Sequence, residues 1–129
     1  MPKAGDKFKT NTYQNWGEYN PKRVSPSRPR RLNETYIVIP RYYAEMFGIY
    51  MKNKIGAVIE YDAYDQTGQF ICTLKAQGNQ YAGDIFAKQF AGRRNLTALV
   101  DWIDTYGVTD NDVIEVEFLT PNSLRLTVV

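Results

Sequence analysis

Short strand-like segments separated by turn residues are the feature that most restricts how this chain can fold. Turn sequences stand at residues 65–68 and 120–123, and the segments on either side of them are apolar or alternate between polar and apolar residues. The predicted strands are residues 36–39, 49–64, 69–74, 112–118 and 124–129. A succession of short strands linked in this way favours a sheet that curls into a barrel.

Two helices are predicted, each inserted between strands. Pro40 suits the first position of a helix and Gly48 suits a left-handed cap, so residues 41–47 should form two helical turns. Further on, Asn95 is a favourable N-cap, and apolar side chains follow at helical spacing up to Gly107. The expected fold class is therefore mainly β with two short helices.

The length of 129 residues, with 43% hydrophobic and 23% charged residues, is suited to one domain with a core of its own. Residues 1–34 show no apolar periodicity and contain Pro21, Pro26 and Pro29, so we expect a basic, extended N-terminal arm. The arm contains aromatic residues, which favours partial order and packing on the body. The expected barrel domain comprises residues 35–129.

The net charge of +2 is the sum of two unequal parts. Residues 1–35 have eight basic and three acidic side chains, a net charge of +5, whereas residues 36–129 have eight basic and eleven acidic ones, a net charge of −3. Five positive charges lie between Lys22 and Arg31, where there is no acidic residue. A basic segment on a mildly acidic body is typical of a protein that binds a polyanion with one face, although a charged tail can also serve solubility alone.

The chain contains no histidine and only one cysteine, Cys72. This excludes nucleophiles activated by imidazole and removes most zinc, copper and iron sites. No Glu-x-Lys or Asp-x-Lys triplet and no G-x-x-x-x-G-K phosphate loop occurs. We therefore expect no enzymatic activity, no cofactor and no metal. The chain lacks a secretory signal and a membrane-spanning apolar run, so we expect a cytoplasmic protein with no membrane partner.

Residues 39–45 (Ile-Pro-Arg-Tyr-Tyr-Ala-Glu) follow directly after an apolar strand, and they resemble the I-P-K/R-x-x-A-E signature that opens the first helix of B3 DNA-binding domains. Those domains are seven-stranded pseudobarrels of plant transcription factors. Related pseudobarrels are recognition domains of restriction endonucleases such as the EcoRII and BfiI types. Residues 108–118 are similar to the family's L-x-x-G-D-x-V-x-F pattern, with Asn111 where the family usually has Gly. The resemblance covers residues 30–129 and implies a single-chain B3-like pseudobarrel.

The same strand-to-helix turn also occurs in swapped-hairpin, AbrB-like regulators and antitoxins. Residues 39–41, 47–49 and 57–60 fit their pattern too. A swapped-hairpin unit is much shorter and completes its barrel by dimerisation, whereas this chain continues with a second helix and two further strands. We therefore favour the single-chain barrel and a monomer, and the swapped-hairpin barrel is the alternative.

The resemblance implies sequence-specific binding of double-stranded DNA through two arms that hold the major groove. These arms correspond here to Arg28, Arg30, Arg31, Asn33, Thr35 and Arg41, and to Lys75, Gln77, Asn79, Gln80 and Tyr81, with Lys88, Arg93 and Arg94 nearby. Arginine can pair with guanine, amide side chains can pair with adenine, and lysine can bind phosphates. On its own, the second group has the composition of an ordinary turn. Acidic residues collect on the late helix and strand, which we expect on the face away from DNA: Asp101, Asp104, Asp110, Asp112, Glu115 and Glu117.

The protein would then be the recognition domain, or a stand-alone relative, of a restriction enzyme or transcriptional regulator. Its partners would be DNA and, in a larger assembly, a nuclease domain or partner protein. It would act in a bacterial or phage-infected cell, or in the nucleus of a eukaryote. A second hypothesis is a protein-interaction module, such as a phage or antitoxin-like structural protein, without DNA binding. Tyr42, Tyr43 and Tyr50 could line its contact surface, because tyrosine is common at interfaces.

Overall fold

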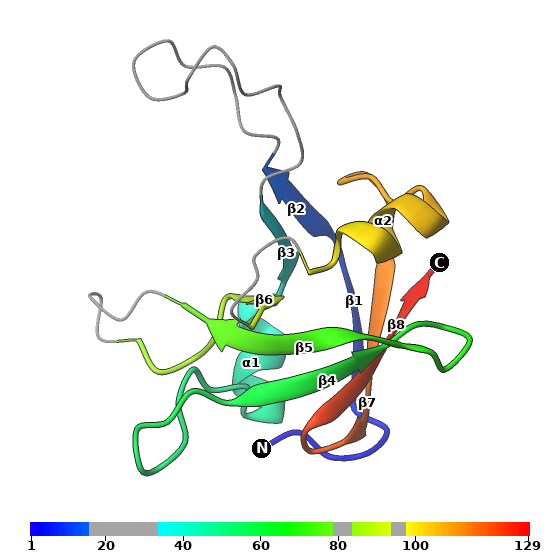
Figure 1. Ribbon diagram of the computed structural model, residues 1–129. Helices are drawn as coiled ribbons and strands as arrows, with labels where there is room; N and C mark the ends of the chain where they lie inside the picture. Colours follow the sequence, from blue (N-terminus) through cyan, green and yellow to red (C-terminus); the bar gives the residue numbers. More distant parts are fainter. Residues whose placement is uncertain (16–33, 79–83, 94–97) are drawn as a thin grey trace, which may run out of the picture.

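The chain folds into one curled sheet with two short helices, as the sequence predicts. The computed structural model describes all residues except 16–33, 79–83 and 94–97, which are grey in Figure 1. In chain order the elements are β1 (Lys7–Thr10), β2 (Thr12–Asn15), β3 (Glu34–Val38), α1 (Arg41–Phe47), β4 (Glu60–Tyr64), β5 (Phe70–Gln77), β6 (Gln89–Gly92), α2 (Val100–Tyr106), β7 (Ile114–Thr120) and β8 (Ser123–Val128). Strands predominate among the described residues, which confirms the predicted fold class.

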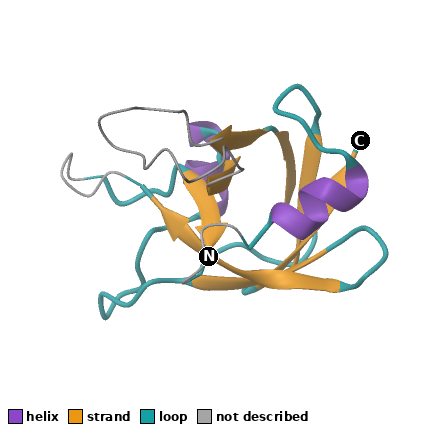
Figure 2. Cartoon of the chain, turned by 45° about the horizontal axis from the view of Figure 1, so that its top comes forward, coloured by secondary structure: helices purple, strands orange, loops and turns teal. Residues whose placement is uncertain are grey.

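The eight strands form a single sheet in the order β1-β7-β8-β4-β5-β6-β3-β2. Neighbouring strands are antiparallel except for β4 and β8, which are parallel. The strands at the two ends of this order, β1 and β2, follow each other in the chain with only Asn11 between them. The Asn11 carbonyl accepts a hydrogen bond from the Val38 N–H at 3.0 Å, so one extended segment joins both edges. The sheet therefore nearly closes into a barrel within one chain (Figure 2), whereas the swapped-hairpin alternative would need a second chain.

The interior of the barrel is filled by side chains that alternate along the strands. On β7, Ile114, Val116 and Phe118 are buried, and the residues between them are more exposed. At the centre, the Tyr61 ring meets the rings of Phe90 and Phe118 edge-on, with centroids 5.3 Å and 5.9 Å away. Edge-to-face packing adds to the stabilisation that burial provides. These aromatic contacts join β4, β6 and β7 across the barrel.

The first helix forms as predicted, and the second is shorter. α1 ends at Gly48, whose φ of 65° is left-handed, while Pro40 lies at the N-cap rather than inside the helix. α2 begins only at Val100, because residues 98–99 form a turn; its predicted cap, Asn95, lies outside the described residues. In the part of the chain that the structure describes, both helices are too short to cross a membrane.

The strand predicted over residues 49–64 forms only in its last part, as β4. A turn interrupts it, because the Asn53 side-chain oxygen accepts hydrogen bonds from the N–H groups of Ile55 and Ala57, both at 3.0 Å. Before this turn, Tyr50 forms only an isolated bridge with Phe86. The segment is therefore a loop that lies beside the barrel rather than a long strand.

The sheet begins earlier than the predicted domain boundary at residue 35. β1 and β2 lie in the segment predicted as an arm, and their side chains at Phe8, Thr10 and Thr12 are buried. Two of these are threonines, so the segment alternates as a strand without the apolar composition that would reveal one. Thr10 Oγ1 donates to the Val38 carbonyl at 2.7 Å, which satisfies a buried hydroxyl. The rest of the predicted arm, residues 16–33, lies outside the described residues.

Candidate functional site

A hollow on the outside of the barrel gathers several of the residues predicted to bind DNA. It has a volume of about 560 Å³, and its lining includes the last residues of β5, the strand whose end is the arrowhead in Figure 1. We call it the β5–β6 hollow; it is lined by Met51, Val58, Lys75, Ala76, Gln77, Gly78, Lys88 and Gln89. Lys75, Gln77 and Lys88 are predicted site residues that the fold brings together. Of the described residues that line the hollow, none is acidic.

Backbone hydrogen bonds hold both sides of the hollow in place. In the register of β5 and β6, Gln77 lies opposite Gln89. The Lys88 N–H donates to the Gln77 carbonyl at 2.6 Å, and the Lys88 carbonyl accepts from the Ile39 N–H at 2.8 Å. Lys88 is therefore tied by its backbone to the end of β5 and to the residue that follows β3.

Gly78 allows close packing at the edge of the hollow. A Cβ atom at this position would lie 2.7 Å from the Met51 sulfur and 2.9 Å from the Phe86 carbonyl oxygen. Both distances are too short for a side chain, so glycine is what lets the chain pass this close to Phe86. A larger residue would displace Met51 from the lining of the hollow.

Two amides and two ammonium groups determine what the hollow can bind. Gln89 Nε2 donates to Gln77 Oε1 at 3.0 Å, which orients both amides and leaves the Gln77 NH₂ group and the Gln89 oxygen for another molecule. Lys75 and Lys88 form no ion pair with any residue that the structure describes. Lys75 lies opposite Glu60 in the register of β4 and β5, and Lys88 contributes to the lowered pKa of Asp84, but these carboxylates are ion-paired with Arg93 and Arg41. Amides can offer a donor and an acceptor to a base edge, and lysines can neutralise phosphates. The hollow can thus bind an anion that also carries hydrogen-bonding groups.

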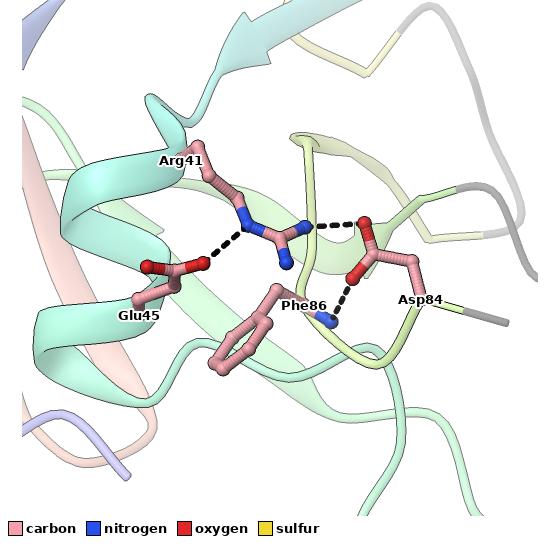
Figure 3. Close-up of polar contacts among 4 residues, drawn as sticks. All are labelled: Arg41, Glu45, Asp84 and Phe86. Atoms are coloured by element: carbon pink, nitrogen blue, oxygen red, sulfur yellow. Dashed lines mark hydrogen bonds and ion pairs between the residues drawn. The ribbon is translucent and has the colours of Figure 1, made fainter. Parts of the chain in front are cut away.

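Arg41, a predicted DNA contact, is engaged within the protein itself. Its guanidinium forms ion pairs with Asp84 and with Glu45 (Nε to Oε1, 2.7 Å), and it lies 4.8 Å from the centroid of the Phe86 ring (Figure 3). Hydrogen bonds to Glu45 and Asp84 raise the pKa of Arg41. The Phe86 N–H and the Arg41 guanidinium lower the pKa of Asp84. The cluster joins α1 to residues 84–86, and its two carboxylates oppose a phosphate near Arg41.

Two further predicted contacts differ from expectation. Arg93 Nε lies 2.5 Å from Glu60 Oε1, so its charge is partly neutralised on the outer face of the sheet. Thr35 is fully buried beside Ile37 on the inner face of β3. The prediction that Thr35 contacts DNA is therefore wrong, because the alternation of the strand turns its side chain toward the core.

The other predicted site residues lie outside the described residues: Arg28, Arg30, Arg31, Asn33, Asn79, Gln80, Tyr81 and Arg94. Their roles stay predictions. Conversely, sequence patterns do not single out Gln89, Met51 or Val58. Gln89 belongs to the hollow because the strand register places it opposite Gln77, and register is not readable from either segment alone. Met51 and Val58 flank the turn at Asn53, within a segment that the sequence predicts as continuous strand.

The acidic late strand lies beside basic residues from the N-terminal segment. In the register of β1 and β7, Lys7 is opposite Glu117 and Lys9 is opposite Glu115. Arg125 Nη2 also contacts Glu117 Oε1 at 2.7 Å. In Figure 1, α2 and β7 lie on the other side of the barrel from the arrowhead of β5. Part of the basic charge of residues 1–35 therefore lies beside the acidic side chains of this strand, away from the hollow (Figure 1).

Two further features concern metal binding and the single thiol. The described residues contain no group of three or more acidic or cysteine side chains that could hold a metal ion. Burial raises the pKa of Cys72 to about 12, so this thiol stays protonated at neutral pH.

Comparison of the chain with protein-family models, curated proteins and solved structures finds no match. The resemblance to B3 domains, carried by residues 39–45 and 108–118 and by the hairpin and helix between them, therefore stays a prediction. The functional argument has to come from the β5–β6 hollow and its surroundings.

Proposed function

We propose that this chain binds double-stranded DNA and that the β5–β6 hollow contacts the duplex. The observation that carries the proposal is the open hollow itself, in which Lys75 and Lys88 stand beside the Gln77–Gln89 amide pair. The lysines would bind phosphates and fix the orientation of the protein, and the amides would read base edges. The B3-like signature supports the same function, which would be that of a recognition domain or stand-alone relative of a restriction enzyme or regulator.

An extended polyanion fits this surface better than a small ligand does. A second hollow, of about 650 Å³, shares Met51 with the first and is lined by Lys52 and Lys54. Asp84 also lines it, but its carboxylate is ion-paired with Arg41. Cationic side chains therefore continue from Lys75 and Lys88 onto the neighbouring loop, as expected for a surface that follows a phosphate backbone. Small ligands usually bind in concave pockets that bury most of their surface.

Two double variants with the same change in net charge test the proposal. Lys75→Ala/Lys88→Ala removes the charges of the hollow, whereas Lys7→Ala/Lys9→Ala removes two charges on β1, which pairs with β7 and does not line the hollow. Binding to a labelled duplex of random sequence is measured by fluorescence anisotropy at several salt concentrations. The hollow variant should bind more weakly and reduce the slope of log K against log salt by about 1.8, since each phosphate contact contributes about 0.9.

The control variant should keep nearly the wild-type slope. An equal loss in both variants would show that only net charge matters, and a wild type that fails to bind at low salt would reject DNA binding altogether. Gln77→Ala separates base reading from affinity. It should keep the salt slope but lose base preference when bound sequences are selected from a random pool.

A second function is favoured by the outer face of α1. Tyr42 is 66% exposed and Met46 is 51% exposed, one helical turn apart. Tyr43 differs from them, because its ring stacks between those of Phe8 and Phe47. Exposed tyrosine and methionine are enriched at protein interfaces. If the wild type does not bind duplex DNA at low salt, a protein-interaction module that uses this face of α1 becomes the better proposal.

A further inference from the structure

The loop between Lys52 and Val58 presents a large apolar side chain at its tip. Ile55 is 89% exposed, the most exposed large apolar residue in the described part of the chain. The Asn53 side chain holds the turn, and the Gly56 N–H donates to the Asn53 carbonyl at 3.0 Å, with a left-handed φ of 83° at Gly56. The exposure of Ile55 is therefore built into the backbone of the loop.

This loop is continuous with the β5–β6 hollow. Met51 and Val58, at its two ends, line the hollow, and Val58 is itself 39% exposed. Lys54 stands directly beside the tip, and no acidic residue occurs between residues 46 and 59. Asp84 lines the same hollow as Lys54, but it is ion-paired with Arg41. A duplex seated on the lysines of the hollow would therefore meet a cationic loop whose tip is aliphatic.

We infer that Ile55 contacts the methyl groups of thymine, so that the DNA preferred by this chain is rich in A·T pairs. The inference rests on the proposed function. In the major groove, the C5-methyl group of thymine is the apolar feature that an aliphatic side chain can recognise. The Gln77–Gln89 amide pair suits adenine. The apolar and the amide contacts would thus both favour A·T pairs, while Lys54 binds a phosphate.

Duplexes that contain uracil test this inference, because deoxyuridine lacks only the methyl group of thymidine. The probes are labelled duplexes of alternating adenine and thymine, and of alternating adenine and uracil. Because a thymine occupies every second position of each strand, a methyl group is within reach in any register. The wild type should bind the thymine duplex about fourfold more tightly, which corresponds to about 0.8 kcal/mol for one buried methyl group.

Ile55→Ala should bind the two duplexes equally, whereas Ile55→Val should keep most of the preference. Val113→Ala is the matched control, since Val113 is an exposed β-branched residue that lies before β7, and it should behave as the wild type. Equal affinities of the wild type for both duplexes, or a preference that survives in Ile55→Ala, overturn the inference and leave DNA binding intact. If the wild type binds the random-sequence duplex but neither of these, the inference is overturned; if it binds none of the three, the proposed function itself fails.

Discussion

The buried hydroxyl group of Tyr61 allows a test of the hydrogen bonding inside the barrel core. Tyr61 is 1% exposed, and its hydroxyl has no hydrogen-bond partner among the described residues. Burial raises the pKa of Tyr61 to about 12, so the group stays neutral and uncompensated. A buried polar group without a partner costs about 1–3 kcal/mol, which is the desolvation energy that it does not recover.

Tyr61→Phe should therefore stabilise the protein. Phenylalanine keeps the edge-to-face contacts of the ring with Phe90 and Phe118 and removes only the oxygen. The space left by the oxygen offsets part of the gain, because the lining of a small void loses packing contacts. We expect a net increase of about 1 kcal/mol in the free energy of unfolding. With a urea m value of about 2 kcal/mol/M, this raises the midpoint of unfolding by about 0.5 M.

Tyr106→Phe is the matched control. The Tyr106 hydroxyl donates to Asp65 Oδ2 at 3.3 Å, so its removal should lower the free energy of unfolding by about 0.5–1.5 kcal/mol. Urea unfolding followed by circular dichroism measures both variants, and the m value should not change. If Tyr61→Phe destabilises the protein as much as Tyr106→Phe does, the Tyr61 hydroxyl has a partner and the reasoning is refuted.

Two other changes test local features of the fold. Gly48→Ala should lower the free energy of unfolding by about 2 kcal/mol and Gly107→Ala by about 1 kcal/mol, as measured by thermal unfolding. Both glycines have a positive φ, but only at Gly48 would a Cβ also lie 2.9 Å from the Met1 nitrogen. Equal losses in the two variants would contradict this contact. Asp65→Asn should destabilise at neutral pH, since the Thr67 hydroxyl and backbone N–H groups lower the pKa of Asp65. A lowered pKa adds stability above the unfolded-state value of about 3.8, and this is lost as the pH falls through the folded-state value, so wild type and variant should converge in acid.

Local features of this fold are readable from sequence because neighbouring residues determine them. The turn at residues 65–68 forms where predicted, with Asp65 Oδ1 accepting from the Thr67 N–H at 2.8 Å and Gly68 at a φ of 88°. The turn at residues 120–123 likewise joins β7 to β8 as an antiparallel pair. Asp, Gly and Pro in such turns act through their own backbone and side chains, so no distant partner is needed to predict them.

A single-chain barrel could be predicted, but the strand pairing that closes it could not. β1 pairs with β7 at the far end of the chain, and Thr12 Oγ1 donates to Asp110 Oδ1 at 3.2 Å across 98 positions. The parallel pairing of β4 with β8 is equally remote in sequence. Buried threonines in β1 and β2 hide the apolar alternation that identifies a strand. A hydropathy pattern does not indicate which distant segment forms hydrogen bonds with the hydroxyl groups of these threonines.

The candidate site was predictable only in part, and for the same reason. Lys75, Gln77 and Lys88 could be chosen because they lie in the segments that a B3-like domain uses. Side-chain partners that are distant in the sequence could not be predicted. Gln89 is brought to Gln77 by the strand register, and Asp84 pairs with Arg41 from 43 positions away. Residue type thus identified positive charges correctly but did not reveal which of them have carboxylate partners.

The positions of individual lysines change the interpretation of the unequal net charges of residues 1–35 and 36–129. The net charge of +5 in residues 1–35 includes Lys7 and Lys9, which β1 places opposite the glutamates of β7 and away from the hollow (Figure 1). The acidic part, with a net charge of −3, holds Lys75 and Lys88, which form no ion pair in the described residues. The carboxylates near them, Glu60 opposite Lys75 and Asp84 near Lys88, are ion-paired with Arg93 and Arg41. Attraction to a phosphate depends on charges within a Debye length of about 8 Å, so local surplus counts for more than the total of a segment. The case for DNA therefore moves from the total charge of the N-terminal segment to the position of two lysines beside a pair of amides.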